Sequence, residues 1–334
     1  MVETSVIIVG YNSEKYLNDC FDSLKNQTYD DFEIVFVDNN SKDKTKQILK
    51  KYPEIICCWC SSNLGYAGGN NIGVDIARGK YVVLLNPDTK ADKNFLKELI
   101  KTMKSNRKIG ACQPKILIMN KPELINTVEL ATNYLGFSWC GQYMEPSVDA
   151  YLSAEICFAS GAASIYRRDV YEKVGGLDTD YFMYHEDTDL SWGIRLLNYK
   201  IMFNPDAIVY HDYSFGRNKN KIYNEEKNRL VTILKNYKLH SLFLISPMFF
   251  VSELGLFASG FYKEKLKSYV YIFKNIVNIY DKRKFIQERR KVPDSKIVKF
   301  FEGKLKFSRE IDSKGMKYFN AVSNFYWKII IKFI

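Results

Sequence analysis

The first part of the chain alternates short apolar runs with amphipathic segments. The apolar runs have the length and composition of buried strands and cover residues 5–9, 32–37, 54–60 and 81–85. Between them lie segments with the length and polar faces of helices, at residues 13–26 and 42–51 and from the loop 63–71 onward. Continuous apolar strands separated by helices predict an α/β fold, in which helices cover both faces of a mostly parallel sheet.

Polar residues follow directly after these strands. Asp38 ends the second strand, the loop 63–71 follows the third, and Asn86-Pro87-Asp88 follows the fourth. Ligands of such sheets bind at the carboxyl ends of the strands, so these residues are expected to line one site. A carboxylate at the end of a buried strand is costly to desolvate without a partner, which favours a metal ion or a reacting group beside it.

A second acidic site, Glu186-Asp187, follows the aromatic stretch 181–184. With two such sites, one carboxylate can hold a divalent cation against a diphosphate, and the other can take a proton from an attacking hydroxyl. The plainer alternative is an acidic run that only favours the start of a helix over residues 186–198.

Two common nucleotide sites are excluded. A dinucleotide-binding fold needs G-x-G-x-x-G directly after the first strand, but residues 10–15 contain a single glycine. The later cluster of Gly65, Gly68 and Gly69 has the wrong spacing, and no phosphate-binding P-loop is present.

Composition and cysteine content indicate a packed protein of a reducing compartment. The chain has 334 residues, of which 46% are hydrophobic, so disorder is not expected. Seven cysteines form an odd set without repeated zinc spacing, which predicts reduced thiols in the cytosol. The apolar run 6–9 is too short for a signal peptide.

Positive charge is concentrated at the carboxyl end of the chain. Residues 214–334 contain 26 Lys and Arg against 10 Asp and Glu, a net charge of +16, whereas the whole chain carries +11. Lysines flank the apolar stretches 241–251 and 326–331, and this combination favours an anionic membrane surface over nucleic acid.

The same segment is expected to be helical. Residues 241–258 approach the length of a membrane span, but Pro247 and Glu253 interrupt them, so helices lying in the membrane interface are favoured. The last helix combines a lysine stripe with a broad apolar face; packing on the rest of the chain or on a second copy is the alternative. The predicted division is a catalytic region, 1–220, with halves of about 1–110 and 111–220, and a helical membrane-association region, 221–334.

The order of these motifs resembles glycosyltransferase family 2, and most closely its rhamnosyltransferase-like branch. The similar segments lie within residues 4–215 and are 6–12, 37–41, 63–70, 85–88, 175–178 and 186–192. The resemblance implies the GT-A fold and a metal-dependent, inverting transfer. Two residues depart from the family pattern: Gly10 stands where many members have Asn, and Asn86 replaces the first acid of the usual Asp-x-Asp.

The resemblance also assigns site residues. Those expected to bind the nucleotide-sugar are Val9, Tyr11, Asp38, Asn40, Asn63, Gly65, Gly68, Gly69, Asn70, Asn86 and Asp88. Asp38 can accept a hydrogen bond from the imide of uracil or thymine, although a turn aspartate would look the same.

Catalysis, metal binding and acceptor binding are assigned in the same way. Asp187 is the expected catalytic base, and Asp88 with His211 the expected ligands of Mg²⁺ or Mn²⁺. Glu186, Tyr184 and Trp192 are assigned to the acceptor, with core packing as the alternative for the two aromatic residues.

The resulting expectation is a glycosyltransferase on the cytoplasmic face of the cell membrane. It would move a sugar from a UDP- or dTDP-sugar to a lipid-linked or glycan acceptor in polysaccharide, glycolipid or glycoprotein-glycan synthesis. The C-terminal helices would meet anionic lipid or pair two copies, and nucleic acid is not an expected partner. A noncatalytic sugar-nucleotide or glycan-binding protein with the same fold is the alternative hypothesis.

Overall fold

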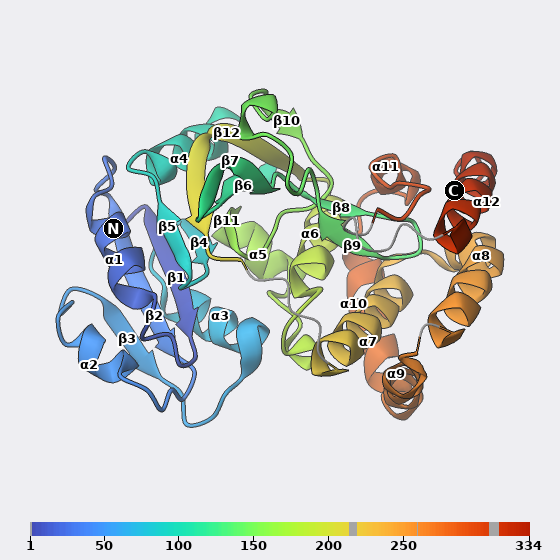
Figure 1. Cartoon of the computed structure of the whole chain (residues 1–334), viewed down its shortest axis with the longest axis horizontal. Helices are drawn as coiled ribbons and strands as arrows, with labels where there is room; N and C mark the ends of the chain where they lie inside the picture. Colours follow the sequence, from blue (N-terminus) through green and yellow to red (C-terminus); the bar gives the residue numbers. More distant parts are fainter. Residues whose placement is uncertain (1, 214–218, 259, 307–313) are drawn as a thin grey trace.

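A computed structural model describes residues 2–213, 219–258, 260–306 and 314–334. An α/β body contains the N-terminus at one end, and a group of helices extends to the C-terminus at the other (Figure 1). The strands are β1 Thr4–Gly10, β2 Phe32–Asp38, β3 Ile56–Trp59, β4 Tyr81–Leu85, β5 Thr89–Ala91, β6 Ile109–Ile118, β7 Lys121–Thr127, β8 Leu130–Thr132, β9 Ser138–Cys140, β10 Ala154–Glu155, β11 Ala163–Arg167 and β12 Lys200–His211. The helices are α1 Leu17–Lys25, α2 Thr45–Leu49, α3 Gly65–Ile76, α4 Phe95–Ser105, α5 Arg168–Val174, α6 Glu186–Leu196, α7 Lys219–Asn236, α8 Leu239–Ala258, α9 Tyr262–Lys274, α10 Ile276–Arg289, α11 Ser295–Val298 and α12 Lys314–Ile330, with short 3-10 turns η1 Ser147–Asp149 and η2 Thr179–Tyr181.

The central sheet is mixed and mostly parallel. Its main path runs β10-β12-β6-β11-β4-β1-β2-β3, with β5 beside β12 and β7 beside β6. The predicted parallel strands β1 to β4 pair as expected, while β11 runs antiparallel between β4 and β6. The carboxyl ends of β1, β2, β4 and β12 therefore meet at one edge of the sheet, the edge where sequence reasoning placed the site.

Alternating side chains of the strands supply two cores, one on each face of the sheet. In β1, Val6 and Ile8 pack with α1, α2 and α4, whereas Ile7 packs toward α3 on the other face. This period of two is what a strand buried on both faces requires. The structure thus confirms the predicted α/β class with helices on both faces.

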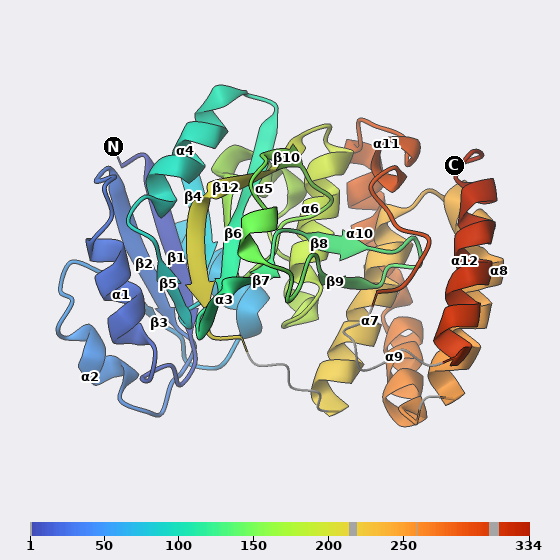
Figure 2. The ribbon, with the colours of Figure 1, turned by 45° about the horizontal axis from the view of Figure 1, so that its top comes forward.

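The C-terminal helices pack against the α/β body. Figure 2 shows α7 and α10 beside α6, with α8 and α12 next to each other at the end farthest from β1 and β2. Trp327 of α12 stacks on Tyr134 at 4.5 Å between ring centroids, and Tyr237 donates to the carbonyl of Tyr134 at 2.9 Å. In the described part of the region expected to be helical, 221–334, the chain forms α7 to α12.

Candidate active site

Asp88 and His211 are brought together at the carboxyl edge of the sheet. Asp88 lies in the turn after β4, and His211 is the last residue of β12, which pairs with β5 through Thr89. Nε2 of His211 lies 3.3 Å from Oδ1 of Asp88, and the imidazole is buried. On its other side, Nδ1 of His211 lies 3.1 Å from Oδ1 of Asn126 in β7.

This geometry fixes which nitrogen of His211 faces the acid. An amide oxygen can only accept, so Nδ1 of His211 must donate its proton to Asn126. In a neutral imidazole the lone pair of Nε2 then points at Oδ1 of Asp88, which is buried and has no hydrogen-bond partner. Two electron-rich atoms in contact need a positive charge between or beside them, which a divalent cation or a proton on Nε2 supplies.

The two residues therefore fit a metal that is held mainly by its other ligands. No group of three or more His, Cys, Asp or Glu side chains that could hold a metal occurs in residues 2–213, 219–258, 260–306 and 314–334. A carboxylate and an imidazole leave most coordination positions to water and phosphate oxygens, as is usual for Mg²⁺ at a nucleotide. The seven cysteines are free thiols.

Asp187 lies at the start of α6 and is held by backbone N–H groups. Its Oδ2 accepts from the N–H of Gly161 at 2.9 Å, and its Oδ1 accepts from Thr188 at 2.7 Å. The neighbouring Ala162 accepts at its carbonyl from the N–H of Asn86 at 2.9 Å. The segment containing Gly161 and Ala162 thus connects the turn of Asp88 to the second acidic site, as the sequence motifs required.

The neighbouring carboxyls of Glu186 and Asp187 differ in how far their pKa values are raised. Burial raises the pKa of Asp187, and the backbone N–H groups of Gly161 and Thr188 oppose this shift. Burial raises the pKa of Glu186 well above its ordinary value, and the charge of Asp187 adds to the effect. Because Oε2 of Glu186 is buried without a partner, the neutral acid is the favoured form there, which leaves Asp187 to carry the charge.

The loop before Asp187 has an unusual backbone. Phe182, Tyr184 and His185 all have positive φ, at 63°, 71° and 70°, a region that costs non-glycine residues about 1 kcal/mol or more each. Helix α7 holds the loop in place, because the amide of Asn228 donates to the carbonyls of Tyr181, Met183 and Tyr184 at 3.1, 3.1 and 2.7 Å. Strained backbone with dense support is typical of a functional loop.

A buried ion-pair cluster fixes α6 to the C-terminal helices. Lys235 of α7 contacts Asp189 at 2.8 Å and Asp178 at 2.6 Å, and all three side chains are buried. Although burial opposes the shift, Lys235 and Lys282 lower the pKa of Asp178 to about 2. Asp189, two residues after the expected base, is therefore paired inside the protein and ties α6 to α7.

The nucleotide-binding residues expected from the sequence form the opposite part of the edge. Asp38 is buried at the end of β2 and accepts from the N–H of Ser41 at 3.2 Å, the hydrogen bond of a turn aspartate. Asn63 accepts from the N–H of Gly65 at 2.9 Å. Gly65 has φ of 72°, and a Cβ there would collide with the carbonyl of Phe182, so glycine is required at this position.

The remaining expected residues are placed as follows. Tyr11 is half exposed, and Val9, Asn40 and Asn86 are partly buried. Asn40 has φ of 67° and accepts from the ammonium of Lys42 at 2.8 Å. Tyr184 is also partly exposed.

Packing corrects the assignment of Trp192 and describes the surroundings of three other assigned residues. Trp192 is fully buried against Phe158, Tyr237 and Phe301, so it belongs to the core and cannot stack on an acceptor. Gly69 lies in α3 where a Cβ would meet Cγ1 of Val9 at 2.5 Å, so glycine allows the helix to pack closely on β1 there. Asn70 is buried and donates to the carbonyl of Tyr66 in its own helix at 2.9 Å. Gly68 is buried in the same helix.

Several residues of the site were not found from the sequence. Asn126 orients His211, Asn228 holds the loop before Asp187, and Lys235 neutralises Asp189. Tyr66, within the loop 63–71, donates to the carbonyl of Gly161 at 2.5 Å and so links α3 to the support of Asp187. These contacts join residues that are 44 to 95 positions apart, and no local sequence pattern predicts them.

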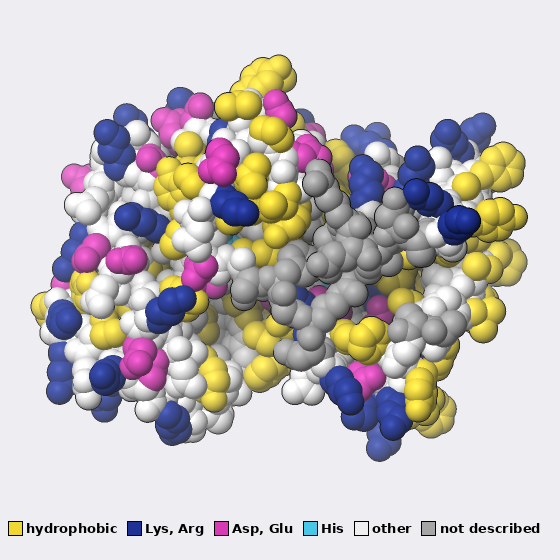
Figure 3. Space-filling view, in the orientation of Figure 1, with side chains coloured by type: hydrophobic (Ala, Val, Ile, Leu, Met, Phe, Trp, Pro, Cys, Tyr) yellow, Lys and Arg dark blue, Asp and Glu magenta, His cyan; other side chains and the backbone are white. Residues whose placement is uncertain are grey.

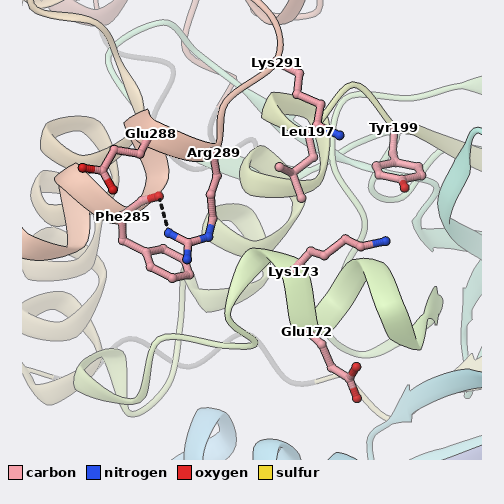
Figure 4. Close-up of a pocket in the computed structure, with 8 residues that line it drawn as sticks. All are labelled: Glu172, Lys173, Leu197, Tyr199, Phe285, Glu288, Arg289 and Lys291. Atoms are coloured by element: carbon pink, nitrogen blue, oxygen red, sulfur yellow. Dashed lines mark hydrogen bonds between the residues drawn. The ribbon is translucent and has the colours of Figure 1, made fainter.

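An open cavity of about 600 Å³ lies away from these acids, between α5, the end of α6 and α10 (Figure 4). It is lined by Glu172, Lys173, Leu197, Tyr199, Phe285, Glu288, Arg289 and Lys291. The guanidinium of Arg289 lies 3.6 Å from the centroid of the Phe285 ring. None of the expected catalytic, metal or nucleotide residues lines this cavity, so it is not the site described above.

The family comparison agrees with the motifs. The model of "Glycosyl transferase family 2" matches residues 5–175, about half of the chain. The chain belongs to this family, and its fold is the GT-A fold followed by a helical region.

Individual relatives are more distant. The poly-beta-1,6-N-acetyl-D-glucosamine synthase of Staphylococcus epidermidis is 27% identical over 209 residues, which is 62% of this chain and 49% of that protein. The chain therefore spans about half the length of this curated relative.

Two solved structures show the same fold. S. aureus TarS 1-349 in complex with UDP-GlcNAc has a TM-score of 0.53 and 20% identity, over 99% of this chain and 90% of that one. GalNAc-T7 with UDP, GalNAc and Mn²⁺ has a TM-score of 0.60 and 16% identity, over 78% of this chain and 52% of that one.

Proposed function

We propose that the protein is an inverting glycosyltransferase that moves a sugar from a UDP- or dTDP-sugar to a lipid-linked or glycan acceptor. The observation that carries this proposal is the contact of Asp88 with His211 in a family 2 fold, with Asp187 linked to the same turn through one short segment. The connecting hydrogen bonds run through the segment of Gly161 and Ala162, which touches both acidic turns. Residues 1–220 would supply the chemistry.

Asp88 and His211 would hold Mg²⁺ or Mn²⁺ beside the donor diphosphate. The buried Oδ1 of Asp88 and Nε2 of His211 lie 3.3 Å apart and would be the protein's ligands to such a cation. A bound cation would neutralise charge on the departing diphosphate. The GT-A structure of GalNAc-T7 with UDP and Mn²⁺ supports a metal of this kind, without defining which one this chain uses.

Asp187 would act as the base. A carboxylate within reach of the acceptor hydroxyl can take its proton as the oxygen attacks the anomeric carbon from the side opposite the diphosphate. The two backbone N–H groups at Asp187 fix the direction of its oxygens, and its raised pKa makes it a stronger base than an exposed aspartate. Glu186, neutral beside it, would keep a second negative charge away from the site and donate to the acceptor.

The donor nucleotide would lie along Asp38 and the loop 63–65. A carboxylate there can accept from the imide N–H of uracil or thymine, whereas cytosine has no proton on the corresponding ring nitrogen. Tyr11 is exposed enough to cover a base. The complex of TarS with UDP-GlcNAc favours a uridine donor among the two.

The acceptor would reach Asp187 past the loop 182–185, where Tyr184 is partly exposed and can contact a sugar ring. We place the enzyme on the cytoplasmic face of the membrane, in the synthesis of a polysaccharide, glycolipid or glycoprotein glycan. The similarity to a polysaccharide synthase supports this class of product.

A thermal-shift screen tests the donor assignment directly. Wild type and Asp88→Ala would be heated with UDP-GlcNAc, UDP-glucose, dTDP-rhamnose and GDP-mannose, each with and without Mn²⁺. A ligand that binds only the folded chain raises Tm by mass action. We expect a rise with a UDP- or dTDP-sugar that requires Mn²⁺ in wild type and is lost in Asp88→Ala. A rise with GDP-mannose alone, or equal shifts without metal, would contradict the proposal.

A noncatalytic binding protein is the rival hypothesis. It predicts the same thermal shift with no release of nucleoside diphosphate, so a turnover measurement separates the two hypotheses.

A further inference from the structure

Helix α8 has its only charged residue on the inside and an apolar face on the outside. Among its residues only Glu253 is charged, and this side chain is buried against Arg229 at 2.6 Å and Lys265 at 2.5 Å. The charge of Glu253, which interrupts the apolar run 241–258 in the sequence, is thus neutralised inside the protein. A helix of a soluble monomer usually has the reverse arrangement, with its charges outside.

The outward face of α8 forms one continuous apolar row. Its exposed residues recur at steps of three and four, the spacing of a single helical face, and are Leu239, Phe243, Pro247, Phe250, Leu254 and Phe257. Phe250 is 66% exposed and Leu254 71%. Side chains this large are seldom left in water side by side unless another surface covers them.

Helix α12 extends the same surface. It lies against α8, where Tyr326 donates to the carbonyl of Leu244 at 2.7 Å. Its outer row is also apolar and consists of Tyr318, Val322, Phe325, Ile329 and Phe333. Figure 3 shows hydrophobic side chains along the edge of the molecule where α8 and α12 lie.

Basic residues border this apolar surface. Lys314, Lys317, Lys328 and Lys332 are exposed, and their spacing places them in a row along α12 next to the apolar one. Basic side chains lie beside the apolar edge at α12 in Figure 3. An apolar face with adjoining lysines and aromatic residues fits the headgroup boundary of an anionic bilayer.

We propose that the outer rows of α8 and α12 dock the enzyme on the surface of an anionic lipid bilayer, with α8 lying along the bilayer. Among the described residues, Leu239–Phe257 is the one helix that is long and apolar enough, by length and composition, to cross a membrane. A crossing would pull Glu253 away from Arg229 and Lys265 and leave buried charges unpaired. A second copy of the chain is a poorer occupant, because pairing would bring two strongly basic segments together.

Docking would follow from the proposed membrane location, but it does not depend on catalysis, so lipid binding and sugar transfer can fail separately. The test is sedimentation of the full chain with vesicles of phosphatidylcholine plus phosphatidylglycerol, without donor or metal. Each buried Phe or Leu contributes roughly tenfold or more to partitioning. Phe250→Glu/Leu254→Glu should therefore lower binding at least about tenfold, and Phe325→Glu/Ile329→Glu likewise.

The matched control is Tyr151→Glu/Leu152→Glu, two residues that are 68% and 66% exposed at a distant turn. This variant should bind like wild type, and circular dichroism would confirm that each variant is folded. Lys328→Gln/Lys332→Gln should weaken binding to anionic vesicles, and vesicles of phosphatidylcholine alone should bind less than anionic ones at low salt.

Three results would overturn the proposal. The first is vesicle binding as strong as that of wild type in both the α8 variant and the α12 variant. Another is equal loss in the Tyr151/Leu152 control. The third is a wild-type dimer that Phe250→Glu/Leu254→Glu converts to a monomer while wild type ignores vesicles, which would assign the surface to a second copy.

Discussion

Nε2 of His211 lies 3.3 Å from Oδ1 of Asp88, although the two residues end different strands of the sheet. Asn126 fixes the imidazole ring by accepting a hydrogen bond from Nδ1. The site therefore has three residues, of which only Asp88 and His211 were predicted from the sequence. The side chain of an amide cannot change protonation state near neutral pH, which keeps Nε2 of His211 directed at the acid.

Removal of either ligand should abolish metal-dependent donor turnover. Asp88→Ala and His211→Ala each leave one ligand, and we expect loss of roughly 10²-fold or more in kcat/KM, the cost of a poorly placed charge at the diphosphate. EDTA should have the same effect on wild type, with recovery in Mn²⁺ or Mg²⁺. Asp206→Asn, an exposed acid in the same strand, is the control and should retain activity. Full turnover of wild type in EDTA would show that Asp88 and His211 form a structural pair.

Asn126 should act on the metal site through His211. Asn126→Ala removes the oxygen that accepts from Nδ1, so the imidazole of His211 is no longer held with Nε2 toward Asp88. We expect Mn²⁺ binding in the presence of UDP, measured by calorimetry, to weaken by roughly 10–100-fold. Unchanged Mn²⁺ affinity in Asn126→Ala would show that Asn126 does not position His211 for a metal.

Substitution of the expected base should separate chemistry from binding. Asp187→Asn keeps the shape but only one of the two backbone hydrogen bonds, because its amide nitrogen cannot accept, and it cannot take a proton. Transfer should therefore fall roughly 10²–10⁴-fold while donor affinity stays near wild type. Because burial raises the pKa of Asp187, the wild-type rate should fall on acidification at a higher pH than an ordinary aspartate of 3.8 would give. Should Asp187→Asn keep its rate while Glu186→Gln loses it, the roles of the two acids are reversed.

Glu186 should make the protein less stable as pH rises. Its folded pKa lies well above the ordinary 4.5, so the folded chain holds a proton that the unfolded chain has lost. The free energy of unfolding therefore falls as pH rises from about 4.5 toward the raised value. Glu186→Gln removes this dependence and should raise Tm at neutral pH relative to wild type. Denaturant titrations at several pH values measure the difference, and a lower Tm for Glu186→Gln at neutral pH would indicate a charged, well-paired Glu186.

Lys235 should be required for folding of the site and not for its chemistry. Lys235→Met leaves Asp178 and Asp189 buried without their shared cation, which costs about 3–5 kcal/mol in such cases. The control Lys173→Met removes an exposed i,i+4 pair with Asp169 and should cost less than about 1 kcal/mol. Urea denaturation provides both values. Equal stability of the two variants would mean that the cluster is better solvated than its burial indicates.

The strands were predictable because each one carries its own signal. Strand Tyr81–Leu85 begins and ends in the structure where the sequence predicted. A short apolar run between a charged residue and Asn-Pro is typical of a buried strand followed by a turn. The edge residues Asp38 and Asp88 followed from the parallel topology. The start of α1 at Leu17 was set later than expected because Asn12 and Ser13 form turn contacts with Lys42 and Tyr11.

The buried polar contacts were not predictable. Trp192 and Lys235 look exposed or functional by residue type, and only the packing of α7 on α6 shows that both are interior. Glu253 appeared to interrupt a membrane helix, whereas its charge is cancelled by Arg229 and Lys265 from two other helices. Such ion pairs depend on how whole helices pack, and this packing cannot be predicted from the residues nearby in the sequence.

The most direct test of the proposed sugar transfer is the release of nucleoside diphosphate from donor in the presence of Mn²⁺. Wild type, Asp187→Asn and Asp88→Ala would be compared on the donor that gives the largest thermal shift, with a membrane lipid extract supplying acceptor. We expect release by wild type that depends on both metal and extract, and release lower by roughly 10²-fold or more in each variant. Binding of the donor without any release, or release that survives in Asp187→Asn, would contradict it.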